Sequence, residues 1–110
     1  KAPDITFFAA RSGHKLLGCI ALKHLNAAQA EIKSMRTPAS ARRTGTGKRL
    51  LEHVIDYATN TGYQSLWLET GSMDFFAPAR QLYQRYGFQF CGPFADYQAD
   101  PNSCFMCKTL

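Results

Sequence analysis

The chain has 110 residues, 45% of them hydrophobic, and a formal net charge of +5, which suits one globular domain rather than a disordered chain. No apolar run approaches the roughly 18 residues of a membrane span, and no secretory signal pattern is present, so we expect one cytoplasmic domain over residues 1–110 without membrane contact. The positive charge favours an anionic partner, and because the basic residues form no long run outside 42–49, we expect a polyphosphate ligand and no nucleic acid.

The first predicted elements are two strands, at residues 5–10 and 16–22. Both segments are short and apolar, and the second is nearly continuous in its apolar character, as a central strand is. Residues 11–14, Arg-Ser-Gly-His, are typical of a turn. The pattern therefore predicts an antiparallel hairpin.

A third strand is predicted at residues 30–37, where the side chains alternate in character. The alternation places Ile32 on one face, and it places Glu31, Lys33 and Met35 together on the other.

A glycine-rich turn at residues 42–47 follows this strand and leads into a predicted helix at 47–61. The first N–H groups of a helix have no partner within it, and the helix dipole is positive at that end. Gly45 and Gly47 allow a ligand to approach the backbone closely. The basic side chains around the turn are Arg42, Arg43, Lys48 and Arg49. This stretch predicts a site for a phosphate or pyrophosphate.

Two well-known phosphate motifs do not fit the spacing of this turn. A nucleoside-triphosphate P-loop needs glycine at position 42 and Ser or Thr after Lys48, but the chain has Arg42 and Arg49 there. A dinucleotide fingerprint counted from Gly45 needs glycine at position 50, which is Leu50.

The second half of the chain is predicted to contain one further strand, one further helix and a final pair of strands. The helix, the strand before it and the strand at 65–69 form the order of a parallel βαβ unit with a right-handed crossover. A second helix begins near Pro78 and ends before Gly87. Residues 88–91 and 103–108 are the last two strands.

The spacing of Cys104 and Cys107 has the Cys-x-x-Cys form, which is compatible with zinc or redox chemistry. However, residues three apart on a strand point to opposite faces, and no second Cys or His pair completes a site. We therefore expect no metal, and free or buried thiols in a reducing compartment.

The motifs together resemble those of the GNAT acyltransferase superfamily. Arg-x-x-Gly-x-Gly at 42–47 is similar to that family's acyl-CoA pyrophosphate loop, and residues 79–88 match its pattern Ala-x-x-Leu-Tyr-x-x-x-Gly-Phe. Residues 30–35 and 66–70 resemble its fourth and fifth strands. Small bacterial acetyltransferases share three further stretches, which in this chain lie at 31–37, 68–71 and 100–103.

The resemblance implies an α/β fold with a mixed α+β sheet, mostly antiparallel, in which two central parallel strands splay apart. Two departures are evident. Phe76 stands where the family often has an asparagine that touches the cofactor. The chain also enters at what looks like the family's second strand, so we expect the N-terminal strand and helices to be missing. The acceptor pocket would then be either incomplete or completed by another chain, and a homodimer is one expected arrangement.

The resemblance implies an acetyl-CoA-dependent N-acetyltransferase that moves an acetyl group to a small or amino-acid-like amine by direct attack. The alternative is a non-catalytic acyl-CoA-binding or regulatory domain. In the family, backbone groups of the fourth strand bind pantetheine and the loop binds the pyrophosphate. Carried onto this chain, the cofactor-binding residues are Met35, Thr37, Arg42, Arg43, Thr44, Gly45, Thr46, Gly47 and Lys48.

The resemblance also implies catalytic roles for three residues. Tyr83 stands at the position of a general acid for the departing thiolate, and Glu31 aligns with a glutamate that serves as general base in some members. Glu69 is a second candidate for the base. From spacing alone, Tyr83 fits a buried helical residue better than a catalytic one, and Glu31 is equally an exposed strand residue paired with Lys33.

Overall fold

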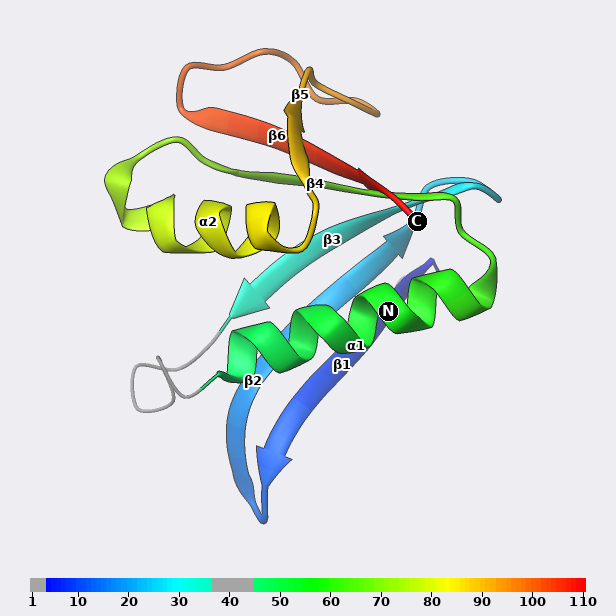
Figure 1. Ribbon diagram of the computed structural model, residues 1–110, viewed down its shortest axis with the longest axis vertical. Coiled ribbons are helices and arrows are strands. Elements are labelled where there is room, and N and C mark those ends of the chain that lie inside the picture. The colour runs from blue at the N-terminus through cyan, green and yellow to red at the C-terminus, as the bar shows by residue number, and fades with distance from the viewer. Residues whose placement is uncertain (1–3, 37–44) are drawn as a thin grey trace.

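The computed structural model describes residues 4–36 and 45–110. Its strands form a six-stranded sheet in the order β1-β2-β3-β4-β6-β5, as Figure 1 shows. The strands are β1 (Ile5–Ser12), β2 (Lys15–His24), β3 (Gln29–Arg36), β4 (Ser65–Gly71), β5 (Gln89–Cys91) and β6 (Ser103–Thr109).

The pairing is antiparallel everywhere among the described strands except between β3 and β4, which are parallel. This confirms the predicted hairpin, the parallel β-α-β order and the mixed, mostly antiparallel sheet. The parallel pair is central because β2 lies on one side of it and β6 on the other.

The β1–β2 turn is tighter than predicted. Arg11 pairs with Leu16 and Ser12 with Lys15, so both belong to β1, and the prediction of a turn at 11–14 is wrong for these two residues. Gly13 has a φ of 60°, which allows the chain to reverse within Gly13 and His14.

The first helix, α1 (Thr46–Thr61), follows the predicted apolar stripe. Leu51, Val54 and Ala58 on its inward side have no exposed surface. Gly62 ends the helix in a left-handed conformation, with φ 103°, and its N–H donates to the carbonyls of Ala58 and Thr59, as expected for a glycine C-cap.

The second helix, α2 (Ala77–Arg85), is preceded by a short 3-10 turn, η2 (Asp74–Phe76). Pro78 lies in its first turn, where the missing N–H has no consequence. Both helices pack on the same face of the sheet (Figure 1), because residues of both join one core with the even-numbered residues of β2, β3 and β4.

The sheet therefore has two distinct faces. The helix face carries the main core, with Leu22, Ile32, Leu66 and Leu68 among its buried side chains. The opposite face, which we call the open face, carries the alternate residues of the same strands, including Glu31 and its register partner Trp67.

Met35 lies on a different face from the one predicted. The register between β2 and β3 passes from the Ala21–Lys33 pair to the Cys19–Arg36 pair, so β3 has one extra residue there. Such a bulge reverses which side chains point to which face. Met35 consequently packs against the core on the helix face, and the prediction that it shares a face with Glu31 and Lys33 is wrong.

The two parallel strands diverge after a short paired stretch. Their register ends at the Ile32–Leu68 pair, although β3 continues to Arg36 and β4 to Gly71. Beyond that pair β4 stays with β6, while β3 stays with β2 and bulges. The result is a V-shaped separation between the ends of β3 and β4 (Figure 1), which confirms the expected splay.

Candidate functional site

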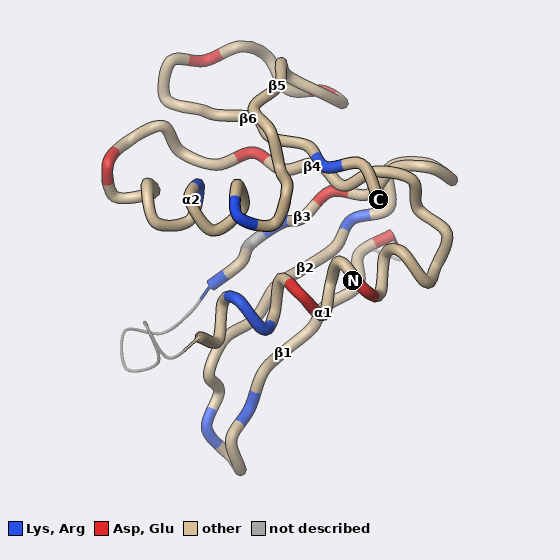
Figure 2. Tube along the Cα trace, in the orientation of Figure 1, with Lys and Arg blue, Asp and Glu red and all other residues tan. Residues whose placement is uncertain are grey.

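The start of α1 has the features of an anion site. Gly45 precedes the helix with φ 84° and ψ 7°, and the first turn contains no acidic residue. Lys48 and Arg49 are exposed in that turn. Figure 2 shows Lys and Arg at the start of α1 and at the end of β3. Of the predicted cofactor residues, Thr37, Arg42, Arg43 and Thr44 lie outside the described residues.

A glycine on β2 lets the start of α1 lie close to the sheet. A Cβ on Gly18 would come within 2.9 Å of Thr46 Cγ2 and 3.0 Å of Leu50 Cδ1, which is too close for a real side chain. Thr46 is only 1% exposed. The first turn of α1 is therefore held against β2, and Thr46 belongs to the packed base of the turn rather than to its surface.

Glu31 lies at the point where β3 and β4 begin to separate. Its side chain is on the open face, 2% exposed, and its Oε2 accepts a hydrogen bond of 2.6 Å from the hydroxyl of Tyr97. Its register partners are Lys23 on β2 and Trp67 on β4. The interpretation of Glu31 as an exposed glutamate is therefore wrong, because the loop that carries Tyr97 covers it.

Glu69 lies on the same face, two residues beyond Trp67 on β4. Its Oε2 accepts a hydrogen bond of 2.7 Å from the hydroxyl of Ser103 on β6. The Glu31 and Glu69 carboxylates both raise the pKa of the Tyr97 phenol. Burial is the largest cause that raises the pKa of the Tyr97 phenol, followed by the Glu31 hydrogen bond and charge and then the Glu69 charge. The fold thus brings the two predicted base candidates together around one hydroxyl.

Tyr97 is a member of this group that the sequence pattern did not single out. It comes from the loop at 92–102, and its ring lies 5.1 Å from Phe94 and 5.5 Å from Phe105, centroid to centroid. Phe94 in turn lies 5.4 Å from Trp67. These rings cover the open face beside the carboxylates. A loop tyrosine 66 residues from its partner leaves no periodic signal, so only the fold reveals the contact.

Tyr83 lies on the helix face. Its ring packs in the core, 5.6 Å from Phe88, and burial raises the pKa of its phenol to about 12. Within the described chain its hydroxyl forms no hydrogen bond. Every fully buried side-chain oxygen in the described residues does have a hydrogen-bond partner. The hydroxyl must therefore reach the surface although the ring is buried.

The loop after β4 is held by an arginine from α2. Arg80 Nη1 donates to the carbonyl of Gly71 at 2.7 Å and to that of Met73 at 3.0 Å. A Cβ on Gly71 would lie 2.3 Å from the Phe76 ring, so Phe76 packs directly on the end of β4. The aromatic ring at this position has a packing role that an asparagine would not fill.

An open cavity of about 390 Å³ lies around the turn between β2 and β3, and Glu31 is not among the residues that line it. Its walls include Lys23, Gln29, Trp67 and Phe94. Lys23 and Trp67 are the register partners of Glu31, so the cavity begins one strand position from that carboxylate, on the side away from the splayed ends.

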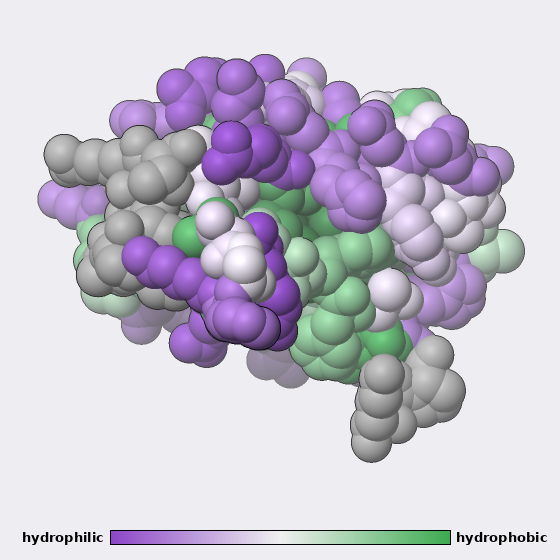
Figure 3. Space-filling view, turned by 90° about the horizontal axis from the view of Figure 1, so that it is seen from below, coloured by the Kyte–Doolittle hydropathy of each residue, from purple (hydrophilic) through white to green (hydrophobic). Residues whose placement is uncertain are grey.

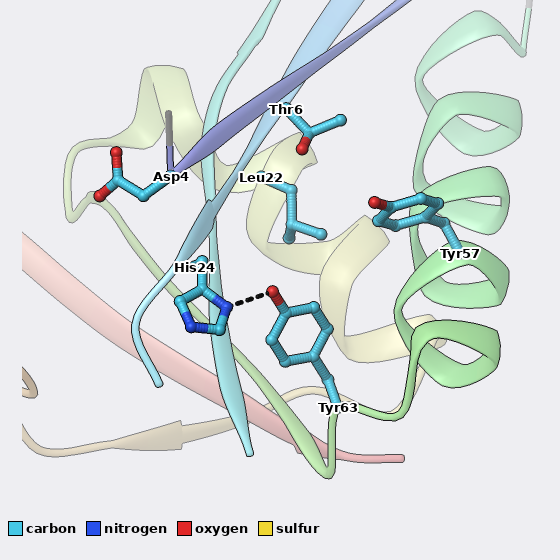
Figure 4. Close-up of a pocket in the computed structure, with 6 residues that line it drawn as sticks. All are labelled: Asp4, Thr6, Leu22, His24, Tyr57 and Tyr63. Carbon is cyan, nitrogen blue, oxygen red and sulfur yellow. Dashed lines mark hydrogen bonds between the residues drawn. The ribbon is translucent and has the colours of Figure 1, made fainter. Parts of the chain in front are cut away.

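A second cavity of about 390 Å³ lies on the helix face, between β1, β2 and the end of α1. Figure 4 shows His24 and Tyr63 pointing toward one another within it, and His24 Nδ1 and the Tyr63 hydroxyl are 2.6 Å apart. Tyr57 lines the same cavity from α1. Because it opens on the other face of the sheet from Glu31, it is separate from the carboxylate group.

The thiols of Cys104 and Cys107 point away from each other, as the sequence predicts. Cys107 is the register partner of Trp67 and Cys104 of Thr70, which places the two thiols on opposite faces of β6. The thiol close to Cys107 is Cys91 on β5, and burial, with the neighbouring Cys107 thiol, raises the pKa of Cys91 to about 11. Residues 4–36 and 45–110 contain no cluster of three side chains suited to a metal ion.

The surface also carries apolar side chains without cover. Figure 3 shows a hydrophobic area bordered by hydrophilic residues when the molecule is seen from below. In the described part of the chain the most exposed large apolar residues are Phe75 at 72%, Phe7 at 64% and Met73 at 57%. No helix described here is long and apolar enough to cross a membrane.

Comparison with known proteins identifies relatives over the whole chain. A family model described as "Acetyltransferase (GNAT) family" matches residues 1–88. The chain is 56% identical over 110 residues to an uncharacterized N-acetyltransferase, YsnE, of Bacillus subtilis, and the match covers 100% of this chain and 73% of that protein. It is 39% identical over 109 residues to an IAA acetyltransferase of Azospirillum brasilense, covering 98% of this chain and 70% of the relative.

Solved structures have the same fold. A Klebsiella pneumoniae protein, provisionally named an acyl-CoA N-acyltransferase, is 32% identical with a TM-score of 0.89, and the match covers 97% of this chain and 73% of that one. A GNAT family acetyltransferase from Elizabethkingia anophelis, solved with acetyl-CoA bound, is 22% identical with a TM-score of 0.81, covering 97% and 77% of the two chains.

Proposed function

The chain belongs to the GNAT acetyltransferase family and is an enzyme of that family, and we propose that it moves the acetyl group of acetyl-CoA to the amine of a small or amino-acid-like acceptor by direct attack. Residues 1–110 would act as one acetyltransferase domain. The observation that carries the proposal is the V-shaped separation of β3 and β4, with two carboxylates on one face of the sheet and the Tyr83 phenol on the other.

The start of α1 would hold the pyrophosphate of the cosubstrate. The N–H groups at the start of a helix and the positive end of its dipole favour a polyanion there. Gly45, Gly47 and Lys48 and the backbone of Thr46 would line that site, and we assign Arg42, Arg43 and Thr44 to it as well by their place in the family motif. Thr37 would instead bind pantetheine, together with Met35. The Elizabethkingia anophelis structure, which has acetyl-CoA bound, supports this choice of cosubstrate.

The bulge in β3 suits a strand that must bind a ligand. Met35 lies within it, between the paired residues Lys33 and Arg36, and β4 no longer accompanies β3 at this point. A bulge removes backbone groups from the ladder. We propose that the backbone of Met35 binds pantetheine and that an N–H of this segment polarises the thioester carbonyl, as preorganised donors do in acyl transfer.

The proton transfers follow from the two faces of the sheet. The acceptor nitrogen would attack the thioester carbonyl carbon from the open face, with its proton passing to Glu31 or, as the second candidate, Glu69. The carbon–sulfur bond breaks, and the thiolate takes a proton from the Tyr83 hydroxyl on the helix face. A gap in the sheet is what allows a base and an acid on opposite faces to reach one reacting centre.

The cavity around the β2–β3 turn supports an amino-acid-like acceptor. Trp67 and Phe94 offer an apolar wall, Lys23 offers a cation for a carboxylate, and Asp4 and Asp96 offer carboxylates for an ammonium group. An acceptor held there would present its amine toward Glu31, at the end of the cavity nearest the strand separation.

The test of the proposed function is release of free thiol from acetyl-CoA in the presence of a panel of amines and amino acids. We expect thiol release that depends on an amine, with acetylated product detected by mass spectrometry. Binding of CoA in calorimetry without turnover on any amine would instead favour the alternative, a non-catalytic acyl-CoA-binding domain. Absence of CoA binding would contradict both.

Replacing Gly47 with valine should abolish CoA binding while the protein stays folded. Gly47 is in the first turn of α1, is partly exposed and does not have the positive φ of Gly45. The backbone at this position therefore accepts valine, but the valine side chain would occupy the space of the pyrophosphate. Calorimetry with CoA checks this. Thr61→Val, at the other end of α1, controls for a β-branched residue in the same helix. Unchanged CoA affinity in folded G47V would contradict the assignment of this turn.

A further inference from the structure

The loop at 92–102 between β5 and β6 is built to hold one tyrosine over the open face. Its far end is fixed to the loop after β4, where Ser72 Oγ donates to the Pro101 carbonyl at 2.6 Å and Ser72 N donates to the Asn102 carbonyl at 3.0 Å. Ala95 has a φ of 52°, a conformation that costs energy in a residue with a Cβ. The turn it creates leads directly to Tyr97.

Tyr97 contacts Glu31 on the open face of the sheet. Its hydroxyl donates to Glu31 Oε2 at 2.6 Å, and its ring packs against both Phe94 and Phe105. A carboxylate that is 2% exposed requires a partner to remain charged, and a charge-assisted hydrogen bond is the strong kind. Tyr97 is therefore both the cover and a hydrogen-bond donor of this carboxylate.

We propose that Tyr97 is a positioning residue for the transfer reaction, holding one oxygen of Glu31 so that the other receives the proton of the acceptor amine. This rests on the proposed role of Glu31 as the base. Tyr97 would also link the loop at 92–102, which contributes Phe94 to the acceptor cavity, to that base.

The charges around Glu31 make this single hydrogen bond important. Lys23 faces it from β2 and Lys33 lies on the same side of β3, while Glu69 on β4 is a like charge and β6 contributes the apolar Phe105. Burial keeps the Tyr97 phenol protonated by raising its pKa, so it remains a donor over the working pH range. Its loss would leave Glu31 beside a second carboxylate with less stabilisation of its charged form.

The experiment compares Tyr97→Phe with Tyr86→Phe in the full chain. Tyr86 also donates to a glutamate, Glu52 on α1, but away from the open face, so Y86F controls for loss of a tyrosine–glutamate hydrogen bond. For Y97F we expect kcat/KM to fall on the order of 10- to 100-fold, the range for a hydrogen bond to a charged group. The acidic limb of its pH profile should move to higher pH, because the charged carboxylate has lost a donor. The CoA affinity of Y97F should match that of the unmodified protein. The kcat/KM and pH profile of Y86F should also match those of the unmodified protein.

A double variant separates this inference from the proposed function. If Glu31→Gln is already impaired, Tyr97→Phe in that background should add little. If Glu31→Gln retains full activity, the role of Glu31 as base fails, and with it the premise. If Glu31→Gln is impaired but Y97F keeps the normal rate and pH profile, only the positioning role of Tyr97 is overturned. A slower Y97F with an unshifted pH profile also overturns it, since Tyr97 would then merely be a wall of the cavity.

A second substitution keeps the proposal testable should Y97F fail to fold. 3-Fluorotyrosine at position 97 preserves the ring and the hydroxyl but makes the hydroxyl a stronger donor. The acidic limb of the pH profile should then move to lower pH, opposite to the shift in Y97F. An unmoved limb would overturn the proposal.

Discussion

Replacing Tyr83 with phenylalanine is expected to lower turnover by about 10²–10⁴-fold, the usual contribution of a positioned proton donor. The proposed role of its hydroxyl is to protonate the CoA thiolate as the carbon–sulfur bond breaks. The ring is part of the core and the hydroxyl forms no hydrogen bond within the described residues, so phenylalanine should preserve packing. CoA affinity and melting temperature should be nearly unchanged.

The pH dependence sharpens this test. Burial raises the pKa of the Tyr83 phenol to about 12, so the proton to be donated is present at every pH below that value. The deficit of Tyr83→Phe should therefore be constant between about pH 7 and pH 10, rather than growing or vanishing with pH. Tyr86→Phe, one position beyond the same helix, is the matched control. Normal turnover in Tyr83→Phe would mean that Tyr83 only packs and that water protonates the thiolate.

Replacing Glu31 with glutamine is the second substitution with a large expected effect, again about 10²–10⁴-fold in turnover. Glutamine keeps the size of the side chain and can still accept the Tyr97 hydrogen bond, so the partly buried hydroxyl retains a partner. Alanine would leave that hydroxyl unsatisfied and confuse stability with chemistry. The measurement is turnover of acetyl-CoA and an amine as a function of pH, with CoA affinity measured in parallel.

The loss in Glu31→Gln should be largest at low pH and shrink as pH rises. At low pH the amine is protonated and a base is needed most, whereas at high pH free amine is abundant. Glu69→Gln provides the comparison, because the charge of Glu69 also acts on the Tyr97 phenol and Glu69 is the alternative base. A pH–rate profile unchanged in Glu31→Gln but changed in Glu69→Gln would transfer the role to Glu69.

Other expectations from the sequence stay predictions. They are the cytoplasmic location, the absence of a nucleic-acid partner and a homodimer. The acceptor is likewise a proposal, supported by the cavity around the β2–β3 turn rather than by any relative's name.

The sequence by itself determined the elements of the fold, because the signals for them are local. Helical spacing marked the inward stripe of α1, Gly62 and Pro78 marked helix boundaries, and runs of apolar residues marked the strands. Motif spacing at 42–47 and 79–88 was sufficient to identify the family, since these segments must keep their order and separation to build one site.

Only the tertiary structure decided the environment of the candidate site. The bulge that turns Met35 toward the core arises from the pairing of β3 with β2 and leaves no trace in the alternation of β3 itself. The contacts of Glu31 with Tyr97 and of Glu69 with Ser103 join residues 66 and 34 positions apart. Burial, charge and hydrogen bonding of a carboxylate depend on what the completed sheet places beside it, and a single strand's sequence contains no information about those distant partners.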